Sequence, residues 1–238
     1  MSKAIVTRAT GPHIELLDIA MPTFERFAER HGYDIVVAEL ECPRPASWHK
    51  IPALLAALDE YEQALWLDAD VVIVDDSEDI TVPGFKWQAL VAHHTQDGEV
   101  PNCGVWLVRQ PMRPWLERIW SMRDYVNHAW WEQAAMCELL GYRGYPLTLA
   151  DPGELVARTA FLGKEWNPHK NDPEEIDRPR FRHATMYEDR AAVMRAWAAM
   201  AEMPPEVRSA LEDPSSVLTE TIYEEGVDLL TAVQAELA

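Results

Sequence analysis

The stretch ALWLDADVVIV at residues 64–74 sets two carboxylates, Asp68 and Asp70, between two apolar runs. Branched and aromatic residues dominate runs that are too short for an ordinary helix, so the stretch predicts a buried strand. An ionised carboxylate inside a core is costly unless it is paired or bound to a metal, so we expect the strand to emerge at a sheet edge here. Alternation along a strand places both side chains on the same side. Two hard oxygen ligands in that arrangement suit Mg²⁺ or Mn²⁺, ions that keep positions open for substrate phosphates.

Composition and charge narrow the class of protein. A length of 238 residues is enough for one large α/β domain or for one domain with a helical extension. The composition, 48% hydrophobic and 26% charged, is ordinary for a globular protein. A formal net charge of −19 repels the phosphates of nucleic acids and anionic membranes, so neither is an expected partner. The three cysteines form no CxxC pair, and no apolar run resembles a signal peptide or a membrane span. We therefore expect a cytoplasmic protein in a reducing compartment.

The order of the expected elements indicates the fold class. Strand-like segments at residues 4–7, 33–38 and 64–74 alternate with helical patterns at residues 14–31 and 53–61. Short connections in this β-α-β-α-β order imply an α/β fold whose mostly parallel sheet carries helices on both faces. Ligands bind such sheets at the carboxyl ends of the strands, where the segments 7–10 and 68–70 would both lie.

The second half of the chain is expected to complete the sheet and add helices. Residues 89–92 and 103–108 read as strands, residues 112–140 as a tryptophan-rich helical region, and residues 141–182 as a loop-rich stretch. The acidic, alanine-rich tail reads as helices broken at Pro204-Pro205 and Pro214. We expect a domain at residues 1–185 and a helical C-terminal extension at residues 186–238, packed on that domain or at a contact between subunits of a homo-oligomer.

Six blocks along the chain resemble one family in their order and spacing. They are WHKIP at residues 48–52, WLDAD at 66–70, PNCGVW at 101–106, WEQAA at 131–135, WN at 166–167 and FRHA at 181–184. The series resembles the galactosyl, mannosyl and xylosyl transferases of the fungal and plant Golgi, over roughly residues 3 to 185, and it leaves the tail out. The resemblance implies the Rossmann-like GT-A fold. It also implies a metal-dependent glycosyltransferase that moves a sugar from a nucleoside diphosphate sugar to an acceptor hydroxyl, with retention at the anomeric carbon.

The resemblance implies a metal site. In that family the DxD motif holds a divalent metal that bridges the donor diphosphate, which assigns Mn²⁺ or Mg²⁺ to Asp68 and Asp70. The alternative is a solvated strand end. His183 matches the family's late histidine and is implied as the third ligand, since neutral imidazole binds borderline ions such as Mn²⁺. His169 is the competing histidine, and an ordinary surface histidine is the remaining interpretation.

The resemblance also implies contacts to the donor. Lys50 matches a donor-phosphate contact, with a surface lysine lying along apolar neighbours as an equal alternative. Asn102 and Gly104 resemble the block that shapes the donor-sugar pocket, because glycine permits close backbone approach and an amide can donate and accept toward hydroxyls. Cys103 stands where the family usually has a small hydroxyl residue, which leaves the donor sugar open. Further donor contacts are expected from the two strand ends, with uridine ahead of guanosine as the base: Thr7, Arg8, Ala9, Asp68 and Ala69.

Glu132 and Gln133 form a second acidic position. In related retaining enzymes an acidic-glutamine pair contacts the donor sugar near its reacting face. The resemblance therefore implies that this pair stabilises positive charge developing at the anomeric carbon. An exposed acid at a helix N-terminus is the alternative. Trp130 and Trp131 read as half-buried packing or as a platform for the acceptor.

Two other functions fit parts of the sequence. Residues 68–73 also fit the nucleophile motif of haloacid-dehalogenase-like phosphatases, in which the first aspartate attacks a phosphoryl group. That motif belongs on the first strand of its sheet and needs a downstream lysine and a distant acidic pair. A catalytically inactive nucleotide-sugar-binding protein is the other alternative. The acceptor stays open among a small molecule, a lipid-linked sugar and a glycan.

Overall fold

The computed structural model describes residues 1–170, 176 and 178–203. Its main sheet is six-stranded, with the order β2-β1-β3-β6-β5-β9. Only the pairings of β6 with β3 and with β5 are antiparallel, so the sheet is mixed but mostly parallel, as predicted. The strands are β1 (Lys3–Thr7), β2 (Asp34–Val37), β3 (Gln63–Leu67), β5 (Gln88–Thr95), β6 (Gly98–Arg109) and β9 (Thr159–Leu162).

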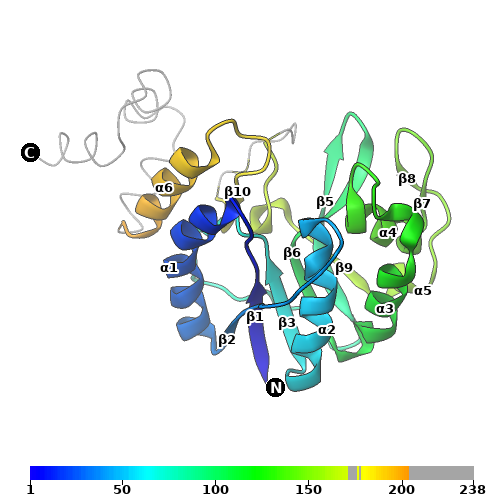
Figure 1. Ribbon diagram of the computed structural model, residues 1–238, viewed down its shortest axis with the longest axis horizontal. Coiled ribbons are helices and arrows are strands. Elements are labelled where there is room, and N and C mark those ends of the chain that lie inside the picture. Colours follow the sequence, from blue (N-terminus) through cyan, green and yellow to red (C-terminus); the bar gives the residue numbers. More distant parts are fainter. Residues whose placement is uncertain (171–175, 177, 204–238) are drawn as a thin grey trace, which may run out of the picture.

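Helices cover both faces of this sheet (Figure 1). Alternate strand residues face opposite ways: Ile5 and Leu65 pack in the core beneath α1 and α6, while Trp66 packs in the core beneath α2, α3 and α4. Each large apolar side chain buried in these cores contributes about 1.5–3 kcal/mol, which holds the helices to the sheet. The helices are α1 (His13–His31), α2 (Lys50–Glu60), α3 (Arg113–Ser121), α4 (Trp131–Leu140), α5 (Glu154–Ala157) and α6 (Arg190–Ala201).

Short elements fill the stretches between the main ones. Residues 141–182 were expected to be loop-rich, but they hold α5 and several short strands. The short strands form two pairs, β4 (Val71–Ile73) with β10 (Phe181–His183) and β7 (Tyr142–Arg143) with β8 (Thr148–Leu149). Four 3₁₀ turns complete the described structure: η1 (Ala46–His49), η2 (Gln110–Met112), η3 (Arg123–Tyr125) and η4 (Lys164–Trp166).

The predicted continuous strand at residues 64–74 is wrong at its centre. β3 ends at Leu67, the chain turns, and β4 begins at Val71 in a different sheet, with the Val71 N–H donating to the Asp68 carbonyl at 3.1 Å. The turn lets both carboxylates leave the main sheet, where burial of a charge would be costly. The two aspartates therefore converge through a turn and not through strand alternation.

The pairing of β4 with β10 determines where the late histidine lies. His183 is opposite Val71 in this antiparallel register, and the Ala184 N–H donates to the Asp70 carbonyl at 2.8 Å. A segment more than one hundred residues downstream of the DxD turn is thus held beside it by backbone hydrogen bonds.

α6 is the described part of the tail. Met194 and Trp197 are buried in the core that α6 shares with α1 and β4. The helix breaks expected at Pro204-Pro205 and Pro214 lie outside the described residues, and the boundary at residues 185 and 186 stays a prediction. Among the described helices, none combines the length and the apolar character that a membrane crossing requires.

The glycine that follows α1 gives a stability prediction. Gly32 has φ 70°, and its N–H donates to the Ala28 carbonyl at 2.8 Å, as expected for a left-handed helix cap. Gly32→Ala should lower the free energy of unfolding by about 1–2 kcal/mol, because an L side chain is strained there. Gly84→Ala is the control in urea unfolding, since a methyl group meets open space at both glycines but only Gly32 has positive φ. Equal stability of the two variants would contradict the assignment of Gly32 as a left-handed helix cap.

Candidate functional site

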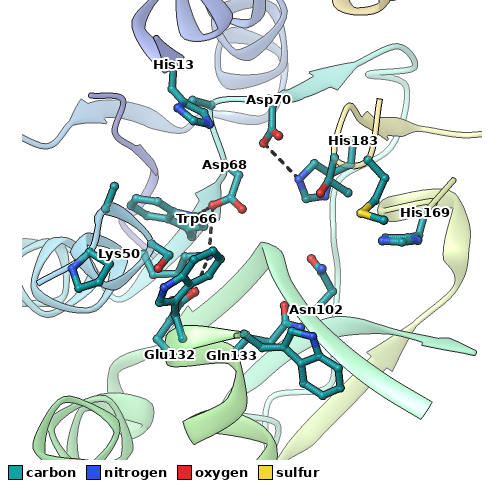
Figure 2. Close-up of a pocket in the computed structure, with 18 of the residues that line it drawn as sticks. His13, Lys50, Trp66, Asp68, Asp70, Asn102, Glu132, Gln133, His169 and His183 are labelled. Atoms are coloured by element: carbon teal, nitrogen blue, oxygen red, sulfur yellow. Dashed lines mark hydrogen bonds and ion pairs between the residues drawn. The ribbon is translucent and has the colours of Figure 1, made fainter. Parts of the chain in front are cut away.

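A cavity of about 990 Å³ opens where β1 and β3 end (Figure 2). Arg8 and Ala9 line it from the end of β1, and the segment 68–70 lines it from the end of β3. The polar residues singled out in the sequence therefore meet at one edge of the sheet, as predicted from the carboxyl ends of parallel strands.

Asp68, Asp70 and His183 form one cluster in this cavity. Each offers a ligand atom, and these three atoms lie within 4.8 Å of one another. It is the one such group of acidic, histidine or cysteine side chains in the described part of the chain. His169 also lines the cavity, but its ring lies 5.1 Å from that of His93, and Figure 2 shows His183 beside Asp70. Two carboxylates and one imidazole are a donor set that fits Mn²⁺ or Mg²⁺.

Asp70 is held in its ionised form. Its Oδ1 lies 3.2 Å from His183 Nε2, and its Oδ2 accepts a hydrogen bond from Arg190 at 3.1 Å. Burial raises the pKa of a carboxyl group, but the positive charges of His183 and Arg190 outweigh burial and lower the pKa of Asp70 to about 2. Burial likewise would lower the pKa of His183, yet the Asp70 carboxylate raises it. The carboxylate is thus available as a ligand near neutral pH.

Lys50 is buried between two carboxylates. Its Nζ lies 3.1 Å from Asp68 Oδ1, 3.0 Å from Glu132 Oε1 and 3.1 Å from the Cys103 carbonyl. Burial lowers the pKa of an ammonium group, but these carboxylates outweigh it and raise the pKa of Lys50. The side chain is buried, so the surface-lysine interpretation is wrong. All three of its N–H groups have acceptors, so none is free to donate to another group.

Glu132 is buried at the start of α4 rather than exposed, so the exposed-acid interpretation is wrong. Burial raises the pKa of Glu132, and the charge of Lys50 offsets only part of that effect. Its Oε2 is buried and has no hydrogen-bond partner among the described residues. Gln133 lines the same part of the cavity, and its Oε1 accepts a hydrogen bond from the Cys103 N–H at 3.3 Å.

Asn102 and Gly104 lie beside the metal-ligand candidates. Asn102 lines the cavity and accepts a hydrogen bond from the Gly104 N–H at 2.7 Å. A methyl group on Gly104 would lie 2.4 Å from His183 Cε1, so only glycine fits. The close approach expected at Gly104 therefore exists, but it is an approach to the histidine ring.

Of the other residues predicted to contact the donor, some line the cavity and one does not. Arg8 and Ala9 line the cavity, and Ala69 lies in the turn between the two aspartates. Arg8 also donates to the Ala38 and Leu40 carbonyls, which fixes the loop after β2. Thr7 is fully buried, and its hydroxyl donates to the Leu67 carbonyl at 2.8 Å. The threonine therefore holds β1 to β3 instead of facing a ligand.

Sequence reasoning missed Arg190 and gave no role to Asn167. Arg190 begins α6 in the tail that the resemblance left out, and it reaches back to Asp70. The available signal was an arginine seven positions after the candidate histidine, directly after an aspartate that can cap a helix. Asn167 is 1% exposed and lies 3.0 Å from His183 Nδ1.

Comparison with known proteins identifies both a family and a fold. The galactosyl transferase GMA12/MNN10 family matches residues 9–136. A glycosyltransferase involved in glycosylation of the major capsid of PBCV-1 superposes with a TM-score of 0.64 at 19% identity, over 84% of this chain and 100% of that chain. Among curated proteins, none matches this sequence.

Two further glycosyltransferases of known structure have the same architecture. GlyE of Streptococcus pneumoniae TIGR4 has a TM-score of 0.53 at 13% identity, over 94% of this chain and 64% of that chain. The galactosyltransferase LgtC, solved with donor and acceptor sugar analogs, has a TM-score of 0.50 at 14% identity, over 86% of this chain and 99% of that chain. At these identities the likeness shows the fold, which is the predicted GT-A fold.

The buried ion pair of Lys50 with Glu132 gives a stability prediction. Lys50→Met should lower the free energy of unfolding by about 3–5 kcal/mol, because it leaves a buried carboxylate without its counter-charge. In the double variant with Glu132→Gln, the loss should be smaller than the sum of the single losses by about 0.5–3 kcal/mol. Urea unfolding of the four proteins measures this coupling. Additive losses would show that the pair does not interact.

Proposed function

This chain belongs to the galactosyl transferase GMA12/MNN10 family, and from that premise we propose that it transfers a sugar from a uridine diphosphate sugar to an acceptor hydroxyl, with a divalent metal and with retention. The observation that carries the metal proposal is the convergence of Asp68, Asp70 and His183 within 4.8 Å. The phosphatase alternative is wrong, because the family consists of glycosyltransferases and Asp68 follows β3 rather than the first strand.

The three ligand candidates would hold Mn²⁺ or Mg²⁺ in this proposal. When bound, the ion supplies positive charge that stabilises the leaving diphosphate. Asp70 supports this role because it is ionised and almost fully buried, so its charge is poorly screened by water. Asp68 is less buried, with 28% of its side chain exposed, and so presents an oxygen toward the cavity.

Arg190 would contribute a second positive charge for the diphosphate. Its guanidinium lies 3.1 Å from Asp70 Oδ2 and lines the cavity. An ion bound to Asp70 would take over that carboxylate's negative charge, which leaves the guanidinium free to donate to a phosphate oxygen. In a protein with a net charge of −19, a local cation of this kind is needed for a phosphate ligand.

Glu132 and Gln133 would face the donor sugar. The unpartnered Oε2 of Glu132 is suited to accept a hydrogen bond from a sugar hydroxyl, since a buried oxygen without a partner is unfavourable. Lys50 neutralises much of the charge on Glu132, which favours this hydrogen-bonding role over stabilisation of a positive anomeric carbon. Lys50 would act indirectly on the donor, by fixing Glu132 and Asp68, in place of the phosphate contact first expected.

The acceptor would enter past the start of α4. Trp130 and Trp131 both line the cavity, and Trp131 is 43% exposed. An exposed indole at a cavity wall favours a platform for the acceptor over packing in the core. A small molecule, a lipid-linked sugar and a glycan each remain within this proposal, as do a cytoplasmic location and a homo-oligomer.

Asp70→Asn should abolish metal-dependent nucleotide binding, because the amide removes the buried negative charge that the ion needs. For wild type, UDP with Mn²⁺ at about 100 times its Kd should stabilise the fold by about 2.7 kcal/mol, which a thermal-shift assay detects. Asp151→Asn, the same charge change at an exposed site, should behave as wild type. Wild-type affinity in Asp70→Asn would overturn the metal assignment.

Arg190→Gln should separate metal binding from phosphate binding. The variant should bind Mn²⁺ alone at least as tightly as wild type, because a competing cation next to Asp70 is gone. It should bind the Mn²⁺–UDP complex about 10- to 100-fold more weakly, the equivalent of one lost charge-assisted hydrogen bond. Arg195→Gln is the control on the same helix, since Arg195 pairs with the exposed Glu15. Calorimetric titrations that show no change in UDP affinity would remove Arg190 from the donor site.

A further inference from the structure

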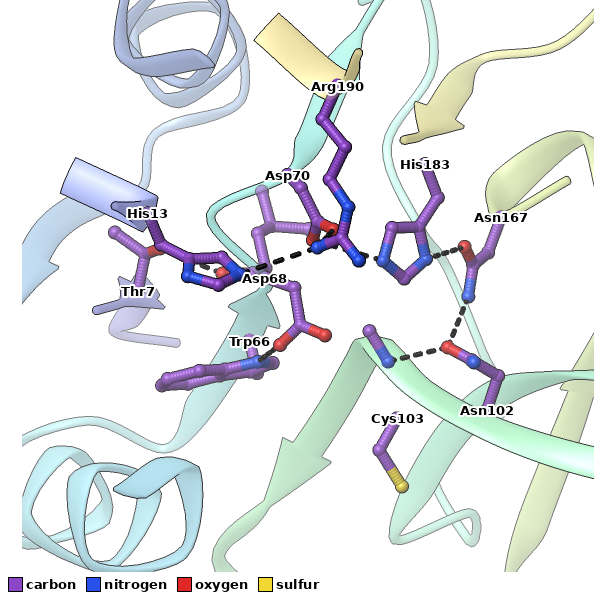
Figure 3. Close-up of polar contacts among 12 residues, drawn as sticks. Thr7, His13, Trp66, Asp68, Asp70, Asn102, Cys103, Asn167, His183 and Arg190 are labelled. Carbon is purple, nitrogen blue, oxygen red and sulfur yellow. Dashed lines mark hydrogen bonds and ion pairs between the residues drawn. The ribbon is translucent and has the colours of Figure 1, made fainter. Parts of the chain in front are cut away.

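Two asparagines connect the backbone of β6 to the ring of His183 (Figure 3). The Gly104 N–H donates to Asn102 Oδ1 at 2.7 Å, and Asn167 Nδ2 donates to the same oxygen at 2.9 Å. Asn167 Oδ1 in turn lies 3.0 Å from His183 Nδ1, and His183 Nε2 lies 3.2 Å from Asp70 Oδ1. One unbroken series of hydrogen bonds therefore runs from a backbone amide to the candidate metal site.

The direction of each bond in this series follows from its first member. A backbone N–H can only donate, so the atom of Asn102 that faces Gly104 must be the carbonyl oxygen. That oxygen can only accept, so Asn167 must turn its amide nitrogen toward it. The remaining Asn167 oxygen then faces His183, and Nδ1 of the ring must carry a proton.

A proton on Nδ1 determines what the other ring nitrogen can do. In a neutral imidazole one nitrogen carries the hydrogen and the other carries a lone pair. In this structure Nε2 donates to the ionised Asp70 carboxylate at 3.2 Å, so both ring nitrogens carry hydrogen. A metal ion next to Asp70 would displace the Nε2 proton, and because Asn167 holds the proton on Nδ1, the lone pair would lie on Nε2. This is the tautomer that a metal ion next to Asp70 requires of His183.

Packing holds the ring in the same orientation. His183 and Asn167 are 6% and 1% exposed, so water does not compete for their hydrogen bonds. The backbone of Gly104 lies against the ring so closely that an added methyl group would be 2.4 Å from Cε1 and 2.9 Å from Nδ1. The ring cannot shift toward β6, and its partner Asn167 limits rotation.

We propose that Asn102 and Asn167 are positioning residues that fix the orientation and the Nδ1–H tautomer of His183, so that Nε2 is presented as a metal ligand. The inference rests on the metal site of the proposed function. Partners of this kind typically change metal affinity by about 10- to 100-fold when they are removed. Each asparagine would act on the ion through the histidine, because its hydrogen bonds lead to the ring and not to Asp68 or Asp70.

Substitutions at residue 102 separate hydrogen bonding from shape. Asn102→Asp keeps an oxygen that can accept from both Gly104 and Asn167, whereas Asn102→Leu has a similar volume and no acceptor. Titration of Mn²⁺ without nucleotide, followed by the EPR signal of free Mn²⁺, should give a Kd about 10- to 100-fold weaker for Asn102→Leu and Asn167→Leu. Asn102→Asp should bind no more weakly than wild type. Wild-type affinity in both leucine variants, or equal losses in Asn102→Asp and Asn102→Leu, would overturn the inference.

The tautomer itself provides a readout that does not need metal. The Asp70 carboxylate competes for a proton on Nε2, so the tautomer is measured in metal-free Asp70→Ala labelled with ¹⁵N-histidine, at a pH where the ring is neutral. NMR should show His183 with hydrogen on Nδ1, and adding His183→Gln assigns the signal. Adding Asn167→Leu should convert it to a mixture or to the Nε2–H form. An Nε2–H ring in Asp70→Ala overturns the inference even if wild type binds Mn²⁺. An Nδ1–H ring in Asp70→Ala, together with a wild-type protein that binds no Mn²⁺, supports the positioning and refutes the metal site instead.

Discussion

The cost of burying ionised groups governs this structure. Asp68 and Asp70 follow a fully buried strand, and an unpaired carboxylate there would cost more than the fold can supply. The chain resolves this by turning at the aspartates and by giving each one positive or hydrogen-bonding partners. Trp66 and Lys50 contact Asp68, while His183 and Arg190 contact Asp70. After the turn, β4 lies in a separate two-stranded sheet, where it pairs with β10 from late in the chain.

These partners join distant parts of the protein at one cavity. Lys50 begins α2 and Glu132 lies at the start of α4 (Figure 2), while Arg190 begins α6 (Figure 3). Helices from both faces of the sheet therefore contribute (Figure 1). Buried ion pairs add little net stability, because desolvation offsets most of their attraction. Their concentration at one cavity therefore favours a role in ligand binding, and it agrees with membership of a glycosyltransferase family.

The antiparallel strand β6 adds the other half of the site. It crosses between the parallel strands β3 and β5, and it carries Asn102, Cys103 and Gly104 to the cavity. These residues contribute mainly backbone groups and one amide: the Cys103 carbonyl holds Lys50, and the Gly104 N–H orients Asn102. The segment that was predicted to shape a donor pocket therefore supports the metal-ligand candidates.

The sequence by itself determined the features that depend on local periodicity and on motif order. The helix that ends before Gly32, the buried strand before Asp68 and the family resemblance all follow from neighbouring residues, so they were predictable, whereas the turn that splits the predicted strand at residues 64–74 was not. Tertiary structure decided the contacts between residues far apart in the chain. The β4–β10 register chose His183 over His169, and the docking of α6 placed Arg190 on Asp70. Such contacts arise from packing and charge pairing in three dimensions, which no local pattern encodes.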